Sequence, residues 1–363
     1  MINLIRTHHS CEYDKKWIEG KNIFDRCVTT SGQWRSYNKH ITIESQTYPY
    51  SLHQDPLMTN YQKTLKEYYN KFASFRLTVK NDYRSVLYGK IFGEYNIKSF
   101  YLELSNQDIT QSLLLPYNDV NDKIILDWLN QTKKYVKLPL HTSELDVKSI
   151  IFKPKAFGYL LHELLGHRLE SDDFNTPITW KHFTELNFNV YDTIGEPSWI
   201  GYTPIDDMGI RGKNVCLLNG QNGQQTFMTP RSGNMRAVGY NWHPIIRQRC
   251  LVVDKLENNH CPEFANVLII EDIKEASFLK NKAILLSNGQ IFIDKANKQY
   301  RVPSLEITIS MQSIPKLKAF GESQVTHPGG GCHKGPQKFL PISFRTPWAW
   351  IQTNRKLISI VYQ

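Results

Sequence analysis

Two histidines and a glutamate in the stretch HELLGHRLE, residues 162–170, have the residue types of a metal centre. In zinc peptidases with the sequence H-E-x-x-H, two histidines four residues apart bind the metal from one face of a helix, and the glutamate takes a proton from the attacking water. Here His167 follows His162 by five residues instead of four. The residue types therefore predict a metal site with Glu163 as the general base, and the spacing needs an explanation.

The spacing excludes a regular helix as the frame of such a site. An α-helix turns about 100° per residue, so residues four apart lie about 40° apart around the axis, and residues five apart lie about 140° apart. For His162 and His167 to bind one ion, either the helix ends early or a one-residue π-bulge brings His167 round to the side of His162. Gly166 favours both, because glycine tolerates strained backbone and often ends helices.

The same stretch is also typical of a buried helix without a metal. Its leucines form a plausible apolar face, and the two histidines would then merely flank that face. These leucines are Leu160, Leu161, Leu164, Leu165 and Leu169. The sequence of the helix leaves this alternative open.

A catalytic zinc site usually has three protein ligands, with water in the fourth position. Glu170 could be the third ligand, or it could orient a ligating imidazole through a hydrogen bond. The segment THPGGGCHKGPQ, residues 326–337, is another source, because its three consecutive glycines let the backbone approach a site closely and a Cys332 thiolate is a good zinc ligand. A flexible surface turn with a free cysteine is the alternative for this segment. The remaining candidates are Asp172, Asp173, His182, Glu185, Glu196, His327 and His333.

The elements that position the motif are predicted from periodicity and turn residues. Residues 147–152 (VKSIIF) predict a buried strand, and Pro154 suits the first position of the motif helix. Upstream, the pattern predicts two helices, at 60–75 and 118–136. It also predicts three strand-like pieces, at 76–79, 85–92 and 99–104. From about residue 190, short strand candidates alternate with Gly, Asn and Pro turns.

We therefore predict an α+β protein with two domains. Residues 1–170 would form an α/β N-terminal domain that ends in the motif helix, and residues 171–363 a mainly β C-terminal domain that supplies Cys332.

Composition excludes several other classes of protein. Lys and Arg total 44 against 34 Asp and Glu, a net charge of +10, but the basic residues are dispersed, so nucleic-acid binding is not favoured. No apolar run reaches the roughly 20 residues of a membrane helix, and no secretory h-region is present, so we expect a cytoplasmic protein without a membrane partner. None of the 6 cysteines falls in a C-x-x-C pair, which argues against a zinc ribbon or a thioredoxin-like motif.

A few other polar residues also suggest chemistry. Arg231, Arg236, Arg247 and Arg249 could hold a peptide carboxylate, although arginines of a β domain usually lie on its surface, which is the interpretation we favour. The pair Asp206-Asp207 could position a substrate or form a turn, and the turn is favoured.

Four stretches in this order resemble the TldD/PmbA family of metallopeptidases. Metal-bearing members carry H-E-x-x-G-H followed by x-L-E, as in residues 162–170, and a C-terminal Cys-Gly-Lys-x-Gly-Gln, which corresponds to Cys332-His-Lys-Gly-Pro-Gln337. Between them, residues 206–209 (DDMG) resemble the family's Asp-Asp-x-Gly loop, and residues 233–236 (GNMR) its Gly-Asn-x-Arg stretch. The resemblance covers roughly residues 145–355.

The resemblance implies a zinc peptidase whose ligands are His162, His167 and Cys332, with Glu163 as the base. It also implies small or unfolded peptide substrates, including modified natural-product precursors and their leader segments, and an active site enclosed in a dimer cavity. The dimer would be a homodimer, or a heterodimer with a homologue that lacks the metal motif. The retained motif implies the catalytic type.

Two residues depart from the family pattern. His333 stands where the family has the glycine after the cysteine, and Pro336 replaces a later glycine. His333 could crowd the site, add a ligand or donate a proton to the tetrahedral intermediate. The N-terminal part also looks shorter than the family's.

We thus expect a zinc-dependent peptidase of small or unstructured peptides, including leader removal or maturation of a modified peptide. The alternatives are a zinc hydrolase of a single biosynthetic small amide and a non-catalytic subunit that shapes a partner's cavity. The intact Glu163 argues against the last of these.

Overall fold

The computed structural model describes residues 4–18, 21–37, 40–48, 61, 74–105, 110–141, 143–172, 186–239, 241–257, 265–329, 331–353 and 358–362. Strands dominate these residues, with the helices α2 and α3 among them, so the expected α+β class is confirmed.

The first part of the chain forms a six-stranded antiparallel sheet in the order β3-β2-β1-β4-β5-β6. Its strands are β1 (Leu4–Ile18), β2 (Lys21–Tyr37), β3 (His40–Tyr48), β4 (Ser74–Tyr88), β5 (Ile91–Ser105) and β6 (Thr110–Pro116). The strand pieces predicted at 76–79, 85–92 and 99–104 merge into the long hairpin β4–β5, which turns at Gly89, where φ is +59°. Strands β1 to β3 lie in the N-terminal region, where we predicted no element.

Helix α2 (Asp122–Lys137) packs on this sheet. The side chain of Asn121 caps its first turn by accepting a hydrogen bond from the Ile124 amide at 3.1 Å, so the predicted helix begins a few residues later than 118. Ile125 and Leu129 are buried with Phe100 of β5 in the core of this part. Of the helix predicted over 60–75, Tyr61 is helical and Ser74 already belongs to β4, and the residues between lie outside the described part.

The second part contains a nine-stranded sheet in which β17-β16-β13-β7-β22-β12-β8-β9 follow one another and β19 pairs with β22. Its strands are β7 (Ser149–Phe152), β8 (Phe188–Thr193), β9 (Val215–Leu218), β12 (Cys250–Lys255), β13 (Val267–Ile270), β16 (Ile291–Ile293), β17 (Gln299–Arg301), β19 (Lys318–Thr326) and β22 (Ser343–Gln352). The pairs β7–β13 and β12–β22 are parallel, and the others are antiparallel.

A smaller antiparallel sheet and two hairpins complete this part. The sheet has the order β14-β15-β18-β23, and the hairpins are β10–β11 and β20–β21. Their bounds are Asp272–Leu279 (β14), Lys282–Asn288 (β15), Leu305–Ser310 (β18), Ile358–Tyr362 (β23), Met235–Arg236 (β10), Ile245–Ile246 (β11), Cys332–Lys334 (β20) and Gln337–Leu340 (β21). Residues 225–228 (QTFM), one of the short strand candidates after residue 190, form only isolated bridges, at Gln225 and Met228.

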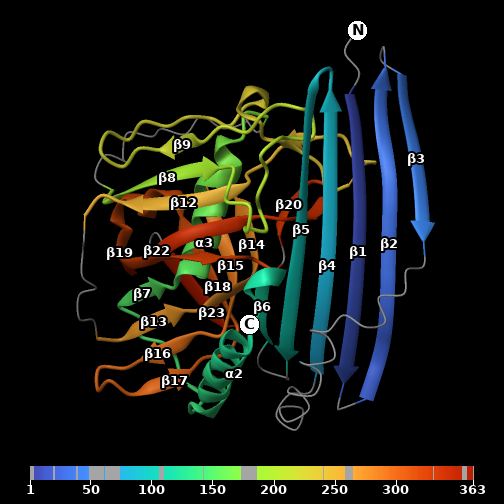
Figure 1. Cartoon of the computed structure of the whole chain (residues 1–363). Coiled ribbons are helices and arrows are strands. Elements are labelled where there is room, and N and C mark those ends of the chain that lie inside the picture. The colour runs from blue at the N-terminus through green and yellow to red at the C-terminus, as the bar shows by residue number, and fades with distance from the viewer. Residues whose placement is uncertain are drawn as a thin grey trace.

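Helix α3 (Pro154–Leu161) lies at the middle of the second part, between the large sheet and β14–β15 (Figure 1). Pro154 occupies the first turn as predicted. The five leucines of the motif stretch are fully buried in one core cluster with residues of both sheets, so the helix is apolar on more than one face. This burial fixes the helix, and hence the residues that follow it.

The strands of the six-stranded sheet stand side by side as one layer next to this second part (Figure 1). Strand β7 already pairs with β13 and β22 of the second sheet, and α3 packs in the same core. The motif helix is therefore held mainly by strands that follow it in sequence. A domain division at residue 170 stays a prediction. In the described part of the chain, no helix is long and apolar enough to cross a membrane.

The close packing of α3 against β22 can be tested at Gly158. A methyl group there would lie 2.2 Å from Cδ2 and 2.8 Å from Cβ of Phe344. In an exposed helix, Gly→Ala stabilises by about 0.5–1 kcal/mol. Here we expect Gly158→Ala to lower the free energy of unfolding by about 1–3 kcal/mol through overpacking. The free energy of unfolding is measured with urea. The double variant Gly158→Ala/Phe344→Leu should be destabilised by less than the sum of the destabilisations of the two single variants. Wild-type or higher stability of Gly158→Ala would refute this packing.

Candidate metal centre

The chain changes its helical geometry at the first histidine. Regular α-helix ends at Leu161, a π-helical turn covers His162–Gly166 (η3), and a 3-10 turn covers His167–Leu169 (η4). The wider turn brings the residue five positions on back to the same side. The rings of His162 and His167 consequently lie with their centroids 4.6 Å apart, so of the two outcomes considered, the structure has the π-bulge.

Gly166 is required for space at this point, and its backbone conformation is ordinary. Its φ of −54° and ψ of −64° are right-handed helical values that any residue adopts. A Cβ atom here would lie 2.4 Å from Oε1 and 2.9 Å from Cδ of Gln248. The glycine therefore admits the Gln248 side chain to the helix, which differs from the backbone freedom that we expected to explain it.

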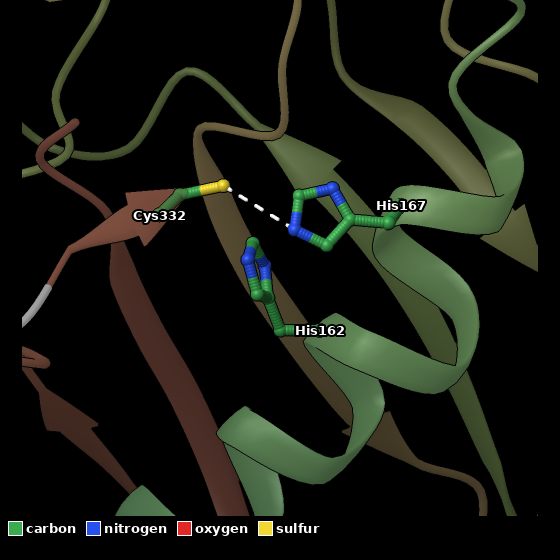
Figure 2. Close-up of side chains that lie close together, drawn as sticks. All are labelled: His162, His167 and Cys332. Carbon is green, nitrogen blue, oxygen red and sulfur yellow. Dashed lines mark hydrogen bonds between the residues drawn. The ribbon is translucent and has the colours of Figure 1, made fainter. Parts of the chain in front are cut away.

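Cys332 begins the hairpin β20–β21 and reaches the two imidazoles from the opposite side (Figure 2). Its Sγ lies 3.5 Å from Nε2 of His167, and the ligand atoms of His162, His167 and Cys332 all lie within 4.8 Å of one another. In tetrahedral zinc sites, with Zn–N of about 2.0–2.1 Å and Zn–S of about 2.3 Å, neighbouring ligand atoms are about 3.3–3.6 Å apart. The three donors thus fit a metal ion of this size after small adjustments.

Each histidine keeps Nδ1 in a hydrogen bond and leaves Nε2 for the cluster. Nδ1 of His162 is hydrogen-bonded to Oε1 of Gln248, and Nδ1 of His167 lies 3.3 Å from Oε2 of Glu170. Nε2 of His162 is buried and, among the described residues, has no hydrogen-bond partner. Metal-binding histidines in proteins are oriented by this kind of contact, and a metal ion would satisfy the orphaned Nε2.

Glu170 is fully buried and links the cluster to the cysteine hairpin. Its carboxylate accepts hydrogen bonds from the backbone N–H of Gln248 at 3.1 Å and from Nζ of Lys334 at 2.7 Å. Burial alone would raise the pKa of Glu170, but His167 and Lys334 lower it below its ordinary value. The carboxylate therefore stays charged and holds His167 through Nδ1. Its position suits the orienting role better than that of a third ligand, because the Cys332 sulfur already lies within reach of both imidazoles.

The thiol and the imidazoles form an ionic cluster. Burial alone would raise the pKa of Cys332, but His167, His162 and Arg247 lower it well below its ordinary value. Burial alone would lower the pKa of His167, but Cys332 and Glu170 raise it well above its ordinary value. A thiolate is the form that binds metal, whereas an imidazolium must lose its proton first. The electrostatics of the site thus favour the thiolate form of Cys332, which is the form that a metal ion needs.

Glu163 lies in the π turn directly after His162, and its side chain is buried, with 7% of the residue exposed. Burial alone would lower the pKa of His162, but Cys332 and, to a smaller extent, the negative charge of Glu163 raise it. The carboxylate is therefore close to the cluster. Its role as base remains a prediction.

The other predicted candidates do not join the three donors. Asp172 binds Nζ of Lys334 at 2.6 Å, His327 binds Oγ of Ser343 at 2.8 Å, and Glu196 is exposed. His333 is exposed, because successive residues of β20 face opposite ways, and its ring contacts Phe339. Asp173, His182 and Glu185 lie outside the described residues.

The remaining motif residues build the frame behind the cluster. Asp206 accepts the amides of Met208, Ile210 and Met235, so the favoured interpretation as a turn residue holds. The Asn234 amide binds Asp192 at 2.7 Å and the Arg247 carbonyl at 3.0 Å.

Gln337, the last residue of the C-terminal motif, ties the cysteine hairpin to the same frame. It donates to the His243 carbonyl at 2.8 Å and accepts the Val238 amide at 3.0 Å.

The interpretation of the arginines as surface residues is wrong for three of the four. Arg236, Arg247 and Arg249 are buried, while Arg231 is exposed. Arg249 pairs with Asp192 at 2.7 Å, and Arg236 donates to the Gln248 and Pro341 carbonyls. These two lie behind the cluster, where carbonyls and one carboxylate compensate their charge.

Gln248 is the functional candidate that the sequence did not reveal. It stands in Arg-Gln-Arg, residues 247–249, between the apolar strands β11 and β12. Three long polar residues inside an apolar run are the signal that could have found it. Only the fold brings Gln248 to His162, which lies 86 positions away.

Two imidazoles and a thiol that could hold one metal ion, with a glutamate beside the first histidine, define a candidate metal centre. Among solved structures, the chain is similar to TldE from Thermococcus kodakarensis, with a TM-score of 0.71 at 12% identity over 97% of this chain and 95% of that one. It is also similar to a candidate modulator of a DNA gyrase from Thermotoga maritima, with a TM-score of 0.67 at 10% identity over 99% of this chain and 96% of that one.

A further candidate modulator of DNA gyrase, from Bacteroides thetaiotaomicron, gives a TM-score of 0.62 at 9% identity over 100% of this chain and 95% of that one. No family model and no curated protein matches the sequence. The chain therefore has the TldD/TldE-type fold over nearly its whole length, and the resemblance that the motifs indicated is confirmed at the level of fold.

The contact between Gln248 and His162 can be tested through metal affinity. We expect Gln248→Leu to weaken zinc binding by roughly 10–100-fold, because the His162 imidazole loses the acceptor that fixes its orientation. Competition with a chromophoric chelator measures this affinity. The exposed Gln221→Leu serves as the matched control and should bind zinc like the wild type. Equal affinity of Gln248→Leu and the wild type would show that this contact does not support the ligand.

His327, near the glycine-rich turn, predicts a pH effect on stability. Burial, and secondarily Lys155, lowers the pKa of His327 to about 4, against 6.5 in the unfolded chain. Between these values the unfolded chain binds a proton that the folded chain does not, so stability rises with pH. This contribution is complete above pH 6.5, is lost as the pH falls to about 4, and amounts to roughly 3 kcal/mol.

Urea unfolding of the wild type and of His327→Asn between about pH 4 and pH 7 checks this. Asparagine can keep a hydrogen bond to Ser343 but does not titrate. We expect the stability difference between the two proteins to change by roughly 3 kcal/mol over this range. A difference that is constant with pH would contradict the buried neutral state of His327.

Proposed function

We propose that the chain is a metal-bearing member of the TldD/PmbA family and a zinc-dependent peptidase. The observation that carries the proposal is the convergence of the His162 and His167 imidazoles with Sγ of Cys332, while both Nδ1 atoms are already held by hydrogen bonds. Two nitrogens and one sulfur suit zinc, which leaves a fourth position for a reacting molecule. The identity of the metal is part of the proposal.

When bound, zinc would supply a Lewis acid that polarises the scissile carbonyl and makes a water molecule more acidic. Glu163 would take the proton from the attacking water and pass it to the leaving amine. Glu170 and Gln248 would keep the imidazoles in the orientation that presents Nε2. Lys334, through its bond to Glu170, couples the cysteine hairpin to the helix.

A cavity of about 610 Å³ supports a peptide substrate. Its lining runs from residues of β4 and β5, such as Arg76 and Tyr101, to Gly331 next to Cys332. This volume admits a short extended peptide or a flexible segment. We therefore propose small or unstructured peptides as substrates, including a leader segment or a modified precursor.

A dimer of the TldD/TldE type fits the fold, as a homodimer or with a metal-free homologue, and we keep the cytoplasm as the expected location. Two alternatives remain as proposals of lower rank. A hydrolase of one small amide would use the same three ligands, and a non-catalytic subunit would not need Glu163. The burial of Glu163 beside the cluster favours catalysis.

The test combines metal analysis with hydrolysis of unstructured peptides. We expect one zinc per chain in the wild type and in Glu163→Gln, but a loss of at least about a thousandfold in kcat for Glu163→Gln, as expected when the general base is lost. Cys332→Ala should lose most of its zinc, and the exposed Glu196→Gln should retain both zinc and activity. Cleavage of one amide alone would support the small-substrate alternative.

Two results would refute the proposal. Full activity of Glu163→Gln would show that Glu163 is not the general base, and full zinc retention in Cys332→Ala would show that Cys332 is not the third ligand.

A further inference from the structure

Arg247 carries a buried charge without a partner in the described part of the chain. It is fully buried, and none of Nε, Nη1 and Nη2 has a hydrogen-bond partner there. An unpaired guanidinium in the interior loses its hydration without compensation, so this arrangement is costly. A group of this kind is explained by a missing partner or by a function.

The neighbouring buried arginines have hydrogen-bond partners, so the lack of partners is specific to Arg247. Arg249, two residues on and equally buried, binds the Asp192 carboxylate and the carbonyls of Gly233 and Lys213. Arg236 donates to two carbonyls. The fold thus supplies partners for the buried arginines that support the frame, whereas the five N–H groups of Arg247 are left over.

Arg247 also lies against the metal centre. The residue before it, Ile246, offers its carbonyl to Lys334 at 3.4 Å, and the residue after it, Gln248, holds His162. The guanidinium charge reaches Cys332, although the sulfur is not within hydrogen-bond distance of it. A divalent metal would place more positive charge beside the guanidinium, so the loaded site favours an anion in this space.

We propose that Arg247 is the anion-binding residue of the site and that it takes a carboxylate of the substrate. The planar guanidinium offers two parallel N–H donors, which match the two oxygens of a carboxylate. This inference rests on the proposed function and deepens it: the substrates would be peptides with a free carboxylate close to the scissile bond. The carboxylate comes either from the C-terminus or from an acidic side chain. Because Arg247 is fully buried in the substrate-free structure, the segments around it have to move to admit the carboxylate.

Stability gives the first readout. Removal of a buried charge that makes no hydrogen bond relieves its desolvation cost, so Arg247→Met should raise the melting temperature of the substrate-free protein or leave it unchanged. Arg249→Met, the matched control, should lower it sharply because Asp192 is left unpaired. A strong loss of stability in Arg247→Met would mean that the residue has a structural partner, and would overturn the proposal.

Binding gives the second readout, in zinc-loaded Glu163→Gln protein, which should not turn over. The probes are acetyl-triglycine, its C-terminal amide, and that amide with one glycine replaced by glutamate. We expect the free acid or the glutamate peptide to bind at least about tenfold more tightly than the uncharged amide, and Arg247→Met to abolish this preference. Preference for the free acid identifies the C-terminus as the source, and preference for the glutamate peptide identifies the side chain.

The exposed Arg231→Met should keep the wild-type preference. Equal binding of all three probes, or a preference that survives in Arg247→Met, would overturn the proposal. Failure of the proposed peptidase function shows itself separately, as full activity of Glu163→Gln, and leaves the binding result to be judged by itself.

Discussion

The π-helical turn at His162–Gly166 is the constraint on which the site depends. An imidazole pair five residues apart can face one ion only if the helix widens by one residue at this point. The turn is held on one side by leucines buried between two sheets and on the other by Gln248, which fits only because residue 166 has no side chain. Packing and the hydrogen bond from His162 to the Gln248 side-chain oxygen therefore act on the same few residues, and the distortion that would weaken an isolated helix is stabilised by the core around it.

The surroundings of this turn concentrate charge in the interior. Glu170 is held by Lys334 and His167, Asp192 by Arg249 and Asn234, and the Cys332 thiol by two imidazoles. Buried charges contribute little to stability even when they are paired, but they fix the positions of the groups that they bind. In this molecule they join the motif helix, the 245–250 segment and the cysteine hairpin into one frame. Arg247 differs from these residues, because its guanidinium has no hydrogen-bond partner in the described part of the chain, and we propose that it binds a ligand.

Much of the site followed from residue types and spacing, and the rest required the fold. The pair His162–His167 and the glycine before the second histidine sufficed to predict a π-bulge as one of two outcomes, since the geometry of a helix is local. Seven of the strands from β9 onward were visible from their short apolar runs (β9, β12, β13, β15, β16, β18 and β23), whereas the central strand β22 was not predicted. Residue types left Cys332, 165 residues from His167, as one of several candidate ligands, and only the resemblance singled it out. The contact of Gln248 with His162 could not be anticipated, because it depends on which strands pair in the large sheet. The burial of the arginines was missed because their partners are main-chain carbonyls and a distant aspartate, which sequence patterns do not show.

The central proposal is that the site binds one metal ion through two imidazole nitrogens and one sulfur. X-ray absorption at the zinc K-edge of the loaded protein measures this ligand set directly. We predict a single sulfur at about 2.3 Å and nitrogen or oxygen ligands at about 2.0–2.1 Å, with the sulfur contribution absent in any zinc retained by Cys332→Ala. Zinc bound by nitrogen and oxygen alone in the wild-type protein would contradict it.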